Sequence, residues 1–121
     1  MKLGRKISGG KYKSQRKKKK YELSRQPRIV KLKERKAKLL KTRGGNSKTV
    51  LFSSNKINLI DKKTKKAKQV SITNVIETPS NRFLARQNIL TKGAIVQTEL
   101  GKAIITNRPG QEGCVQGVLI E

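Results

Sequence analysis

The sequence has no histidine, no tryptophan and only one cysteine among its 121 residues. Without histidine the chain cannot build a Cys-His nucleophile pair, a Ser-His-Asp triad or a histidine general base, and one cysteine cannot supply a zinc finger. That cysteine, Cys114, has no intrachain partner for a disulfide. Because it lies in an apolar run that ends at Ile120, we expect it to be a buried small hydrophobe rather than a reactive thiol.

Aromatic residues make up only 3% of the chain. Proteins that grip single-stranded nucleic acid by stacking usually display an aromatic platform on a strand face, and Phe52 alone is expected in the core instead. Tyr12 and Tyr21 lie in a basic segment, where they can stack on a base or fill a hollow. The seven carboxylates form no paired motif. We therefore expect no enzyme activity, no cofactor and no small-molecule substrate.

Long apolar runs are also missing. No stretch approaches the roughly 18 uninterrupted apolar residues of a membrane-spanning helix, and the start Met1–Lys6 lacks the apolar segment of a secretory signal. The densest basic run has no apolar face with which to lie on a membrane surface. The sequence therefore predicts a cytoplasmic protein without a membrane partner.

Positive charge is what the sequence has in excess. There are 31 Lys and Arg residues against 7 Asp and Glu residues, so the formal net charge is +24. A fold with that charge repels itself until a polyanion neutralises it. Residues 1–50 hold 20 of the Lys and Arg residues and two Glu residues. With membranes set aside, the polyanion is expected to be a nucleic acid that meets mainly the first part of the chain.

Residues 1–27 are predicted to form a long, basic, extended N-terminal arm. The segment has almost no apolar residues to bury, so it cannot offset its own ordering entropy and is expected to stay disordered until its charges meet phosphate. The run Arg16–Lys20 could instead be a nuclear localisation signal or a solvated charge run, but basic residues continue on both sides of it. The predicted RNA-contact residues of the arm and its root are Arg5, Lys6, Lys11, Lys13, Arg16, Lys17, Lys18, Lys19, Lys20, Arg25 and Arg28.

Residues 28–121 are predicted to form an all-β, small barrel-like body. Short runs rich in Val, Ile and Thr recur at intervals of about 8 to 12 residues between turn residues, which is typical of a sandwich or barrel. One segment, residues 31–40, is built of good helix formers, yet we favour strands because it leads without a helix stop into a glycine turn. The predicted strands are 28–33, 37–43, 48–53, 57–61, 68–73, 94–99, 102–106 and 114–120.

Turn residues connect these runs. The clearest hairpin signal is Arg43-Gly44-Gly45-Asn46, since glycine supplies the positive φ of a tight reversal. Further reversals are predicted at 61–66, at Gly101 and at Pro109-Gly110, and a helical turn at 79–86. Arg43 and Asn46 at the hairpin tip are added to the predicted RNA contact, because Arg suits a bidentate phosphate contact; the alternative is a plain turn.

Glycine also alternates with cations in the arm, as in Gly9-Gly10-Lys11, where a backbone without Cβ atoms can lie close to a phosphate chain. A nucleotide-binding loop would need a first glycine at the required spacing, a Ser or Thr after the lysine and a preceding buried strand. None of these is present, so the segment is interpreted as part of the extended contact.

Three blocks of the sequence resemble one known family. They are the arm motifs from Gly4-Arg5-Lys6 to Leu23, the hairpin Arg43–Asn46, and the stretch Asn88–Gln111. Together they are similar to the small-subunit ribosomal protein numbered eight of archaeal and eukaryotic type. The length, without the central insertion of eukaryotic members, resembles the archaeal form. The resemblance implies a β-barrel-like body docked on small-subunit rRNA, with the basic extension passing between RNA helices and ribosomal proteins as neighbours.

The predicted function is therefore structural. The chain is expected to bind and stabilise folded rRNA through phosphate contacts of the arm and hairpin, affinity coming from charge neutralisation rather than from reading of base sequence. A DNA-binding chromatin protein would share the charge and a small basic β fold, and it stays open as the alternative. It predicts comparable affinity for duplex DNA.

Overall fold

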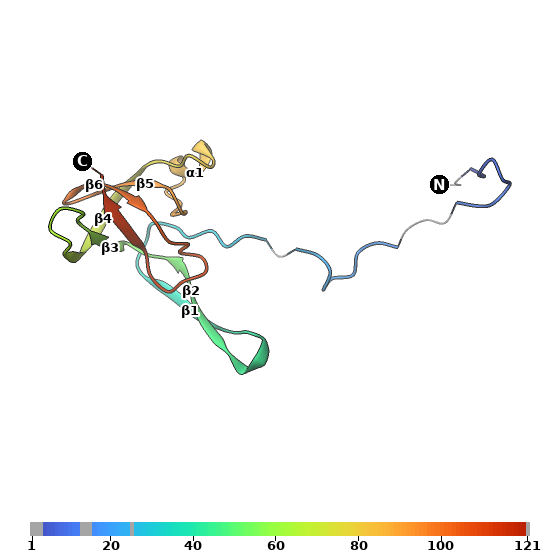
Figure 1. Cartoon of the computed structure of the whole chain (residues 1–121), viewed down its shortest axis with the longest axis horizontal. Coiled ribbons are helices and arrows are strands. Elements are labelled where there is room, and N and C mark those ends of the chain that lie inside the picture. Colours follow the sequence, from blue (N-terminus) through green and yellow to red (C-terminus); the bar gives the residue numbers. More distant parts are fainter. Residues whose placement is uncertain (1–3, 13–15, 25, 121) are drawn as a thin grey trace.

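Five strands close into a barrel, and a two-stranded hairpin and a long N-terminal arm extend from it (Figure 1). The computed structural model describes residues 4–12, 16–24 and 26–120. The regular secondary structure of the described part is almost entirely β, which confirms the predicted all-β class with a barrel-like body and a basic arm. The strands are β1 Lys36–Lys41, β2 Ser47–Ser53, β3 Lys56–Ile60, β4 Ala67–Glu77, β5 Ile95–Thr98, β6 Gly101–Ile105 and β7 Gln116–Leu119.

The barrel has the strand order β3-β4-β5-β6-β7. Neighbouring strands are antiparallel, except that β3 pairs with β7 in parallel and so closes the ring. Buried residues alternate with more exposed ones along the strands, as in β3, where Ile57 and Leu59 are buried and the residues at both ends are exposed. Because successive side chains of a strand point to opposite faces, one set of side chains fills the interior and the other forms the outer wall.

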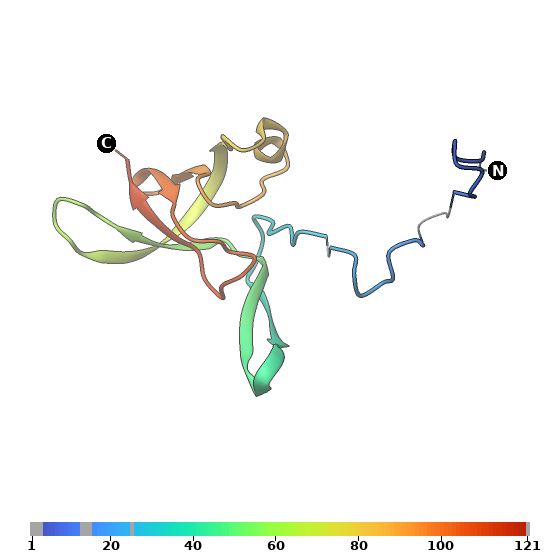
Figure 2. The ribbon, with the colours of Figure 1, turned by 45° about the vertical axis from the view of Figure 1, so that its right-hand side comes forward.

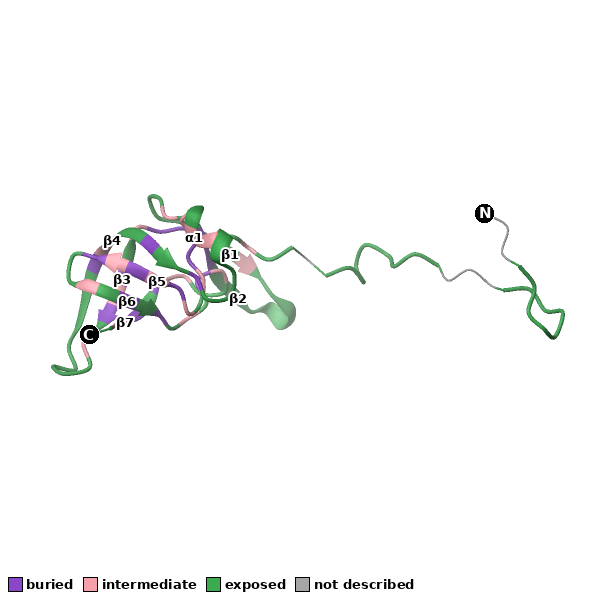
Figure 3. Ribbon diagram, turned by 90° about the horizontal axis from the view of Figure 1, so that it is seen from above, coloured by how far each residue is buried: buried purple, intermediate pink, exposed green. Residues whose placement is uncertain are grey.

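The core consists of aliphatic residues, and full burial of each large side chain contributes about 1.5 to 3 kcal/mol. It includes no aromatic side chain, so its packing depends on branched residues that fill a narrow barrel. Figure 3 shows the buried positions recurring along the barrel strands. The buried cluster is Val30, Leu51, Ile57, Leu59, Val70, Ile72, Val75, Leu90, Ala94, Val96, Ala103, Ile105 and Val115.

The β1–β2 hairpin confirms the choice of strand over helix for the segment of helix formers. β1 pairs antiparallel with β2, and a short 3-10 turn at Arg43–Gly45 reverses the chain. Gly44 and Gly45 have φ of 74° and 76°, which glycine adopts without steric cost. Cross-strand pairing and the turn override the weak helix preference, because intrinsic propensity amounts to only tenths of a kcal/mol per residue.

The prediction of a strand at 28–33 is wrong. The backbone there hydrogen-bonds alternately in two directions: the Lys31 N–H donates to Phe52 O at 3.0 Å, whereas the Leu90 N–H donates to Val30 O at 2.8 Å. Since neither neighbour runs alongside for more than a residue or two, only isolated bridges form at Lys31. Val30 is nevertheless fully buried, so the segment closes the core between β2 and the 88–90 loop.

The other predicted strands are confirmed with shifted ends, and β4 continues to Glu77. The reversals at 61–66 and Gly101 join β3 to β4 and β5 to β6, and Pro109-Gly110 lies in the turn region before β7. The predicted helical turn is confirmed as α1, Arg82–Arg86. Asn81 caps it by accepting a hydrogen bond from the Phe83 N–H at 3.0 Å.

Two side chains differ from their predicted burial. Phe52 is 39% exposed rather than part of the core, because it points outward between Leu51 and Ser53, which face inward. Cys114 is half-buried, and the neighbouring Val115 takes the interior place. For Phe52 the one-residue alternation of β2, rather than the apolarity of the run, assigns the inward side chain. Cys114 lies in the loop before β7. No described helix has the length and apolar character that crossing a membrane requires.

The closest packing around a glycine is at Gly117 in β7. A Cβ there would lie 2.8 Å from Ile104 O and 2.8 Å from Ile57 Cδ1. We predict that Gly117→Ala lowers the free energy of unfolding by about 1 to 3 kcal/mol, the usual cost of overpacking a core. Urea denaturation of the purified chain measures it. Gly4→Ala is the matched control, because nothing lies within 4 Å of a Cβ at Gly4; equal stability of the two variants would contradict this packing.

Candidate nucleic-acid interface

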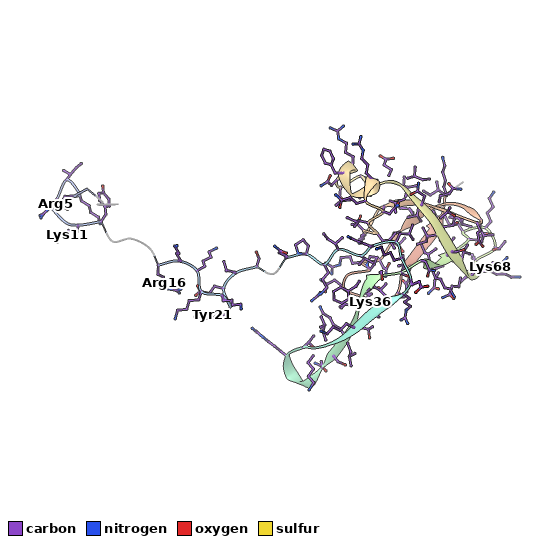
Figure 4. The ribbon with its side chains drawn as sticks, turned by 180° about the vertical axis from the view of Figure 1, so that it is seen from behind. Arg5, Lys11, Arg16, Tyr21, Lys36 and Lys68 are labelled. Atoms are coloured by element: carbon purple, nitrogen blue, oxygen red, sulfur yellow. The ribbon has the colours of Figure 1, made fainter. Side chains whose placement is uncertain are left out.

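The described cations of the arm are all exposed. They are carried on an extended chain that leaves the barrel and makes few contacts with it (Figure 4). A polyanion can therefore approach the arm from more than one side. The predicted contact residues in this part are Arg5, Lys6, Lys11, Arg16 and Lys17 to Lys20; Lys13 and Arg25 lie outside the described residues.

A reverse turn gathers the first group of cations. The Lys6 N–H donates to Gly10 O at 2.8 Å, and Gly9, with φ of 78°, donates its N–H to Lys6 O at 2.9 Å. The turn places Arg5 opposite Lys11, as Figure 4 shows. Lys6 Nζ also lies 5.8 Å from the centroid of the Tyr12 ring, within cation–π range. Residues that are six apart in the sequence thus present their charges together.

An ion pair holds a second turn in the arm. Arg16 donates two hydrogen bonds to the Glu22 carboxylate, at 2.9 and 2.7 Å, and the Lys19 N–H donates to the same carboxylate at 2.9 Å. These bonds stabilise the ionised form, so the pKa of Glu22 is lowered, first by Arg16 and then by the Lys19 N–H. Lys17 to Lys20 lie within the loop that the pair closes, and their side chains remain exposed.

A basic hollow lies where the arm meets the hairpin. It has a volume of about 680 Å³, and its wall carries four cations and no carboxylate. Arg28 is anchored there by donating to Gly110 O at 3.3 Å, and Lys48 Nζ donates to Gln111 Oε1 at 2.7 Å. We call it the junction hollow. Its lining is Gln26, Pro27, Arg28, Leu40, Lys41, Thr42, Arg43, Lys48 and Gln111.

The junction hollow brings together two of the predicted contact residues, Arg28 and Arg43, and adds two that sequence reasoning missed. Lys41 and Lys48 come from the two strands of the hairpin, where Lys41 pairs with Ser47 and Leu40 with Lys48. Knowledge of the hairpin register would have placed both beside the tip. Asn46 is exposed at the tip but does not line the hollow; its carbonyl accepts the Thr42 N–H at 2.7 Å.

The carboxylates near the barrel support local structure. Asp61 accepts hydrogen bonds from its own turn, Glu99 from Ser71, and Glu112 from Asn107. Within the described residues, no group of three or more His, Cys, Asp or Glu side chains could hold a metal ion. What the surface offers is therefore a set of exposed and partly anchored cations with few competing acids, which is the composition of a phosphate-binding surface.

Comparison with known proteins identifies the family. The family model described as Ribosomal protein S8e matches residues 1–120. The chain belongs to this family. Archaeal proteins named small ribosomal subunit protein eS8 are similar over nearly the whole chain. Those of Methanocella arvoryzae, Nanoarchaeum equitans and Methanococcus aeolicus are 46%, 48% and 46% identical, over 96%, 95% and 96% of this chain and 93%, 91% and 91% of their own lengths.

Family membership confirms the resemblance drawn from the three sequence blocks. The chain is a small-subunit ribosomal protein of archaeal type, found in the cytoplasmic ribosome. Membership favours this role over the chromatin alternative. The matched region includes both the arm and the barrel, so the basic extension is part of what the family shares.

The Arg16–Glu22 pair makes the arm turn sensitive to acid. Because the pKa of Glu22 is lowered in the paired state, the pair contributes stability above the ordinary pKa of a glutamate and loses it as the pH falls through the lowered value. We predict that the carboxyl carbon of Glu22, followed by NMR against pH, titrates below the usual glutamate range. In Arg16→Gln the pKa should rise toward the ordinary value. An unchanged pKa in that variant would show that the ion pair does not form in solution.

Proposed function

We propose that the chain is a structural constituent of the small subunit that binds folded rRNA through its arm and hairpin. The observation that carries the proposal is the junction hollow, where the root of the arm and the strands and turn of the hairpin supply four cations to one surface with no carboxylate among them. The surface continues from there into the exposed cations of the arm. A duplex or fold of RNA laid along the hollow and the arm meets one group of cations after another.

Binding by such a surface works through the phosphates. Each Lys or Arg that neutralises a phosphate releases condensed counterions, so many weak contacts add up to a salt-dependent affinity. Arg28 and Arg43 suit bidentate contacts, since the guanidinium presents its N–H donors in a fixed fork. These contacts set position and orientation and carry no base-sequence information. The proposed role is therefore stabilisation of a particular rRNA fold by shape and charge.

The arm and the barrel have different roles in this proposal. We take residues 1–27 as the rRNA-binding extension and residues 28–121 as the body that docks it. The turns at Gly9 and at Arg16–Glu22 gather the arm cations into two groups, and the exposed rings of Tyr12 and Tyr21 lie among them. An aromatic ring beside phosphate-binding cations can stack on an unpaired base. Neighbouring small-subunit proteins are the other proposed partners, whereas no enzymatic role is proposed.

The four consecutive lysines Lys17 to Lys20 test the electrostatic mechanism. Replacing all four by Glu should weaken binding to small-subunit rRNA about a hundredfold at physiological salt, and replacing them by Gln should flatten the slope of log affinity against log salt by about 3 to 4. Filter binding at a series of salt concentrations measures both. The matched control replaces the four lysines by Arg, which keeps the charge and should keep the slope. A loss confined to one RNA sequence, or equal affinity for duplex DNA, would contradict the proposal.

Removal of residues 1–27 tests whether the arm and the body have these separate roles. No described arm residue before Val30 is buried, so the shortened chain is expected to fold with an unchanged far-ultraviolet circular dichroism spectrum. It should nevertheless fail to incorporate stably into small subunits, since the arm supplies much of the phosphate contact. Sedimentation of a native lysate on sucrose gradients at low and high salt measures incorporation. Co-sedimentation of the shortened chain at wild-type amounts would exclude an essential role for the arm.

A further inference from the structure

A second basic region lies at the end of the barrel away from the hairpin and arm. Of the 11 Lys and Arg residues in 51–121, six fall between residues 56 and 68, in and beside the turn that joins β3 to β4. Figure 2 shows this turn and the hairpin extending in different directions, and Figure 4 places Lys68 and Lys36 on different sides of the body.

The turn at 61–66 is held in one shape by its own hydrogen bonds. The Asp61 carboxylate accepts from the Lys63 N–H at 2.9 Å and from Thr64 Oγ1 at 2.8 Å, and the Asp61 N–H donates to Lys66 O at 3.1 Å. The one carboxylate of the turn, that of Asp61, is therefore already hydrogen-bonded within the turn. Lys62, Lys65 and Lys66 are exposed around it, so the turn presents cations from a preorganised backbone, and less ordering entropy opposes their binding to an anion.

Beside this turn the barrel opens into a hollow of about 360 Å³, which we call the barrel mouth. Leu59, Leu100 and Leu119 supply its apolar wall, and Asp61, Thr64, Lys66 and Lys68 supply its polar wall. Register explains the arrangement: Lys68 pairs with Leu59 across β3 and β4, so it leaves the sheet on the core side at the place where the core ends. Leu100, in the turn after β5, is 50% exposed.

An apolar recess next to lysines fits one chemical class of ligand well. An unpaired nucleotide has a flat, weakly polar base face that packs on aliphatic side chains and a phosphate on either side that binds ammonium groups. An apolar protein side chain would use the leucines but not the lysines. A second copy of this chain, with its net charge of +24, would be repelled.

We propose that the barrel mouth is a second RNA site, in which the base of one unpaired nucleotide packs against Leu100 and Leu119 while its flanking phosphates bind Lys66 and Lys68. The proposal rests on the proposed function and extends it, because it adds a contact that the arm and hairpin do not make. With a site at each end of the body, the protein bridges two separate segments of rRNA and fixes their relative position.

The direct test follows the leucine methyl groups of the full chain by NMR. A short single-stranded oligoadenylate and an abasic ribose-phosphate chain of the same length are added in parallel. Oligoadenylate should shift the methyl signals of Leu100 and Leu119 by the ring current of adenine, and the abasic chain should leave them nearly unchanged. Equal shifts with both chains, or no shift with either, would overturn the nucleotide site; the latter result would leave the hollow to a protein side chain.

Charge variants distinguish binding at the barrel mouth from the general effect of the protein's net charge. Lys66→Glu with Lys68→Glu should remove the oligoadenylate shifts at Leu100 and Leu119 and weaken binding to small-subunit rRNA about tenfold. The matched control, Arg82→Glu with Arg86→Glu, makes the same charge change on exposed α1, beyond the opposite end of β4, and should keep the methyl shifts. The unperturbed core methyl signals of Ile57 and Val96 confirm that each variant is folded.

The outcomes distinguish the two proposals. If the wild-type chain does not bind small-subunit rRNA, the proposed function fails. If the wild type binds and both double variants lose the same affinity and keep the same methyl shifts, the effect is one of net charge, and the barrel mouth alone is overturned.

Discussion

Mutual repulsion among the cations is the constraint on which the rest of the structure depends. A net charge of +24 on 121 residues opposes any compact state, so the fold keeps cations apart while still burying enough aliphatic surface to be stable. A closed barrel meets both requirements. Its interior takes mainly aliphatic side chains, and the long basic side chains stay exposed on the outer wall, on turns or at the barrel mouth, where water and counterions screen them. The polyanion that completes the neutralisation is then met from outside.

The pairing of the strands determines where on the surface the positive charge lies. The barrel closes through the parallel pairing of β3 and β7, so it leaves no free strand edge for other chains to pair with. The β1–β2 hairpin lies outside the ring as a two-stranded ribbon. A ribbon of two strands is weakly stable alone. Here Ser53 Oγ donates to Glu34 O and joins the two ends of the hairpin, and Arg35 donates to Gly113 O and ties its base to the body. Lysines along β1 discourage pairing of its free edge.

Local patterns in the sequence were enough to find most of the fold. Alternation located strands such as 57–61 and 102–106, and Gly44-Gly45 located the hairpin, because side-chain period and positive φ are properties of neighbouring residues. The errors have a common cause. Whether 28–33 forms a ladder, and whether Phe52 faces in or out, depends on partners far along the chain. The four cations of the junction hollow come from Arg28 and from the hairpin, and no local pattern in the sequence contains this proximity.

The charge, the absence of histidine and the family motifs in the sequence were sufficient to predict a non-enzymatic ribosomal role, because composition and motif are complete in the chain before it folds. Which cations lie together was settled by folding. Hairpin register brings Lys41 and Lys48 to Arg28, and barrel closure puts Leu59, Leu100 and Leu119 beside Lys66. A binding surface is a set of distances between residues remote in sequence, and those distances exist only once the strands have paired.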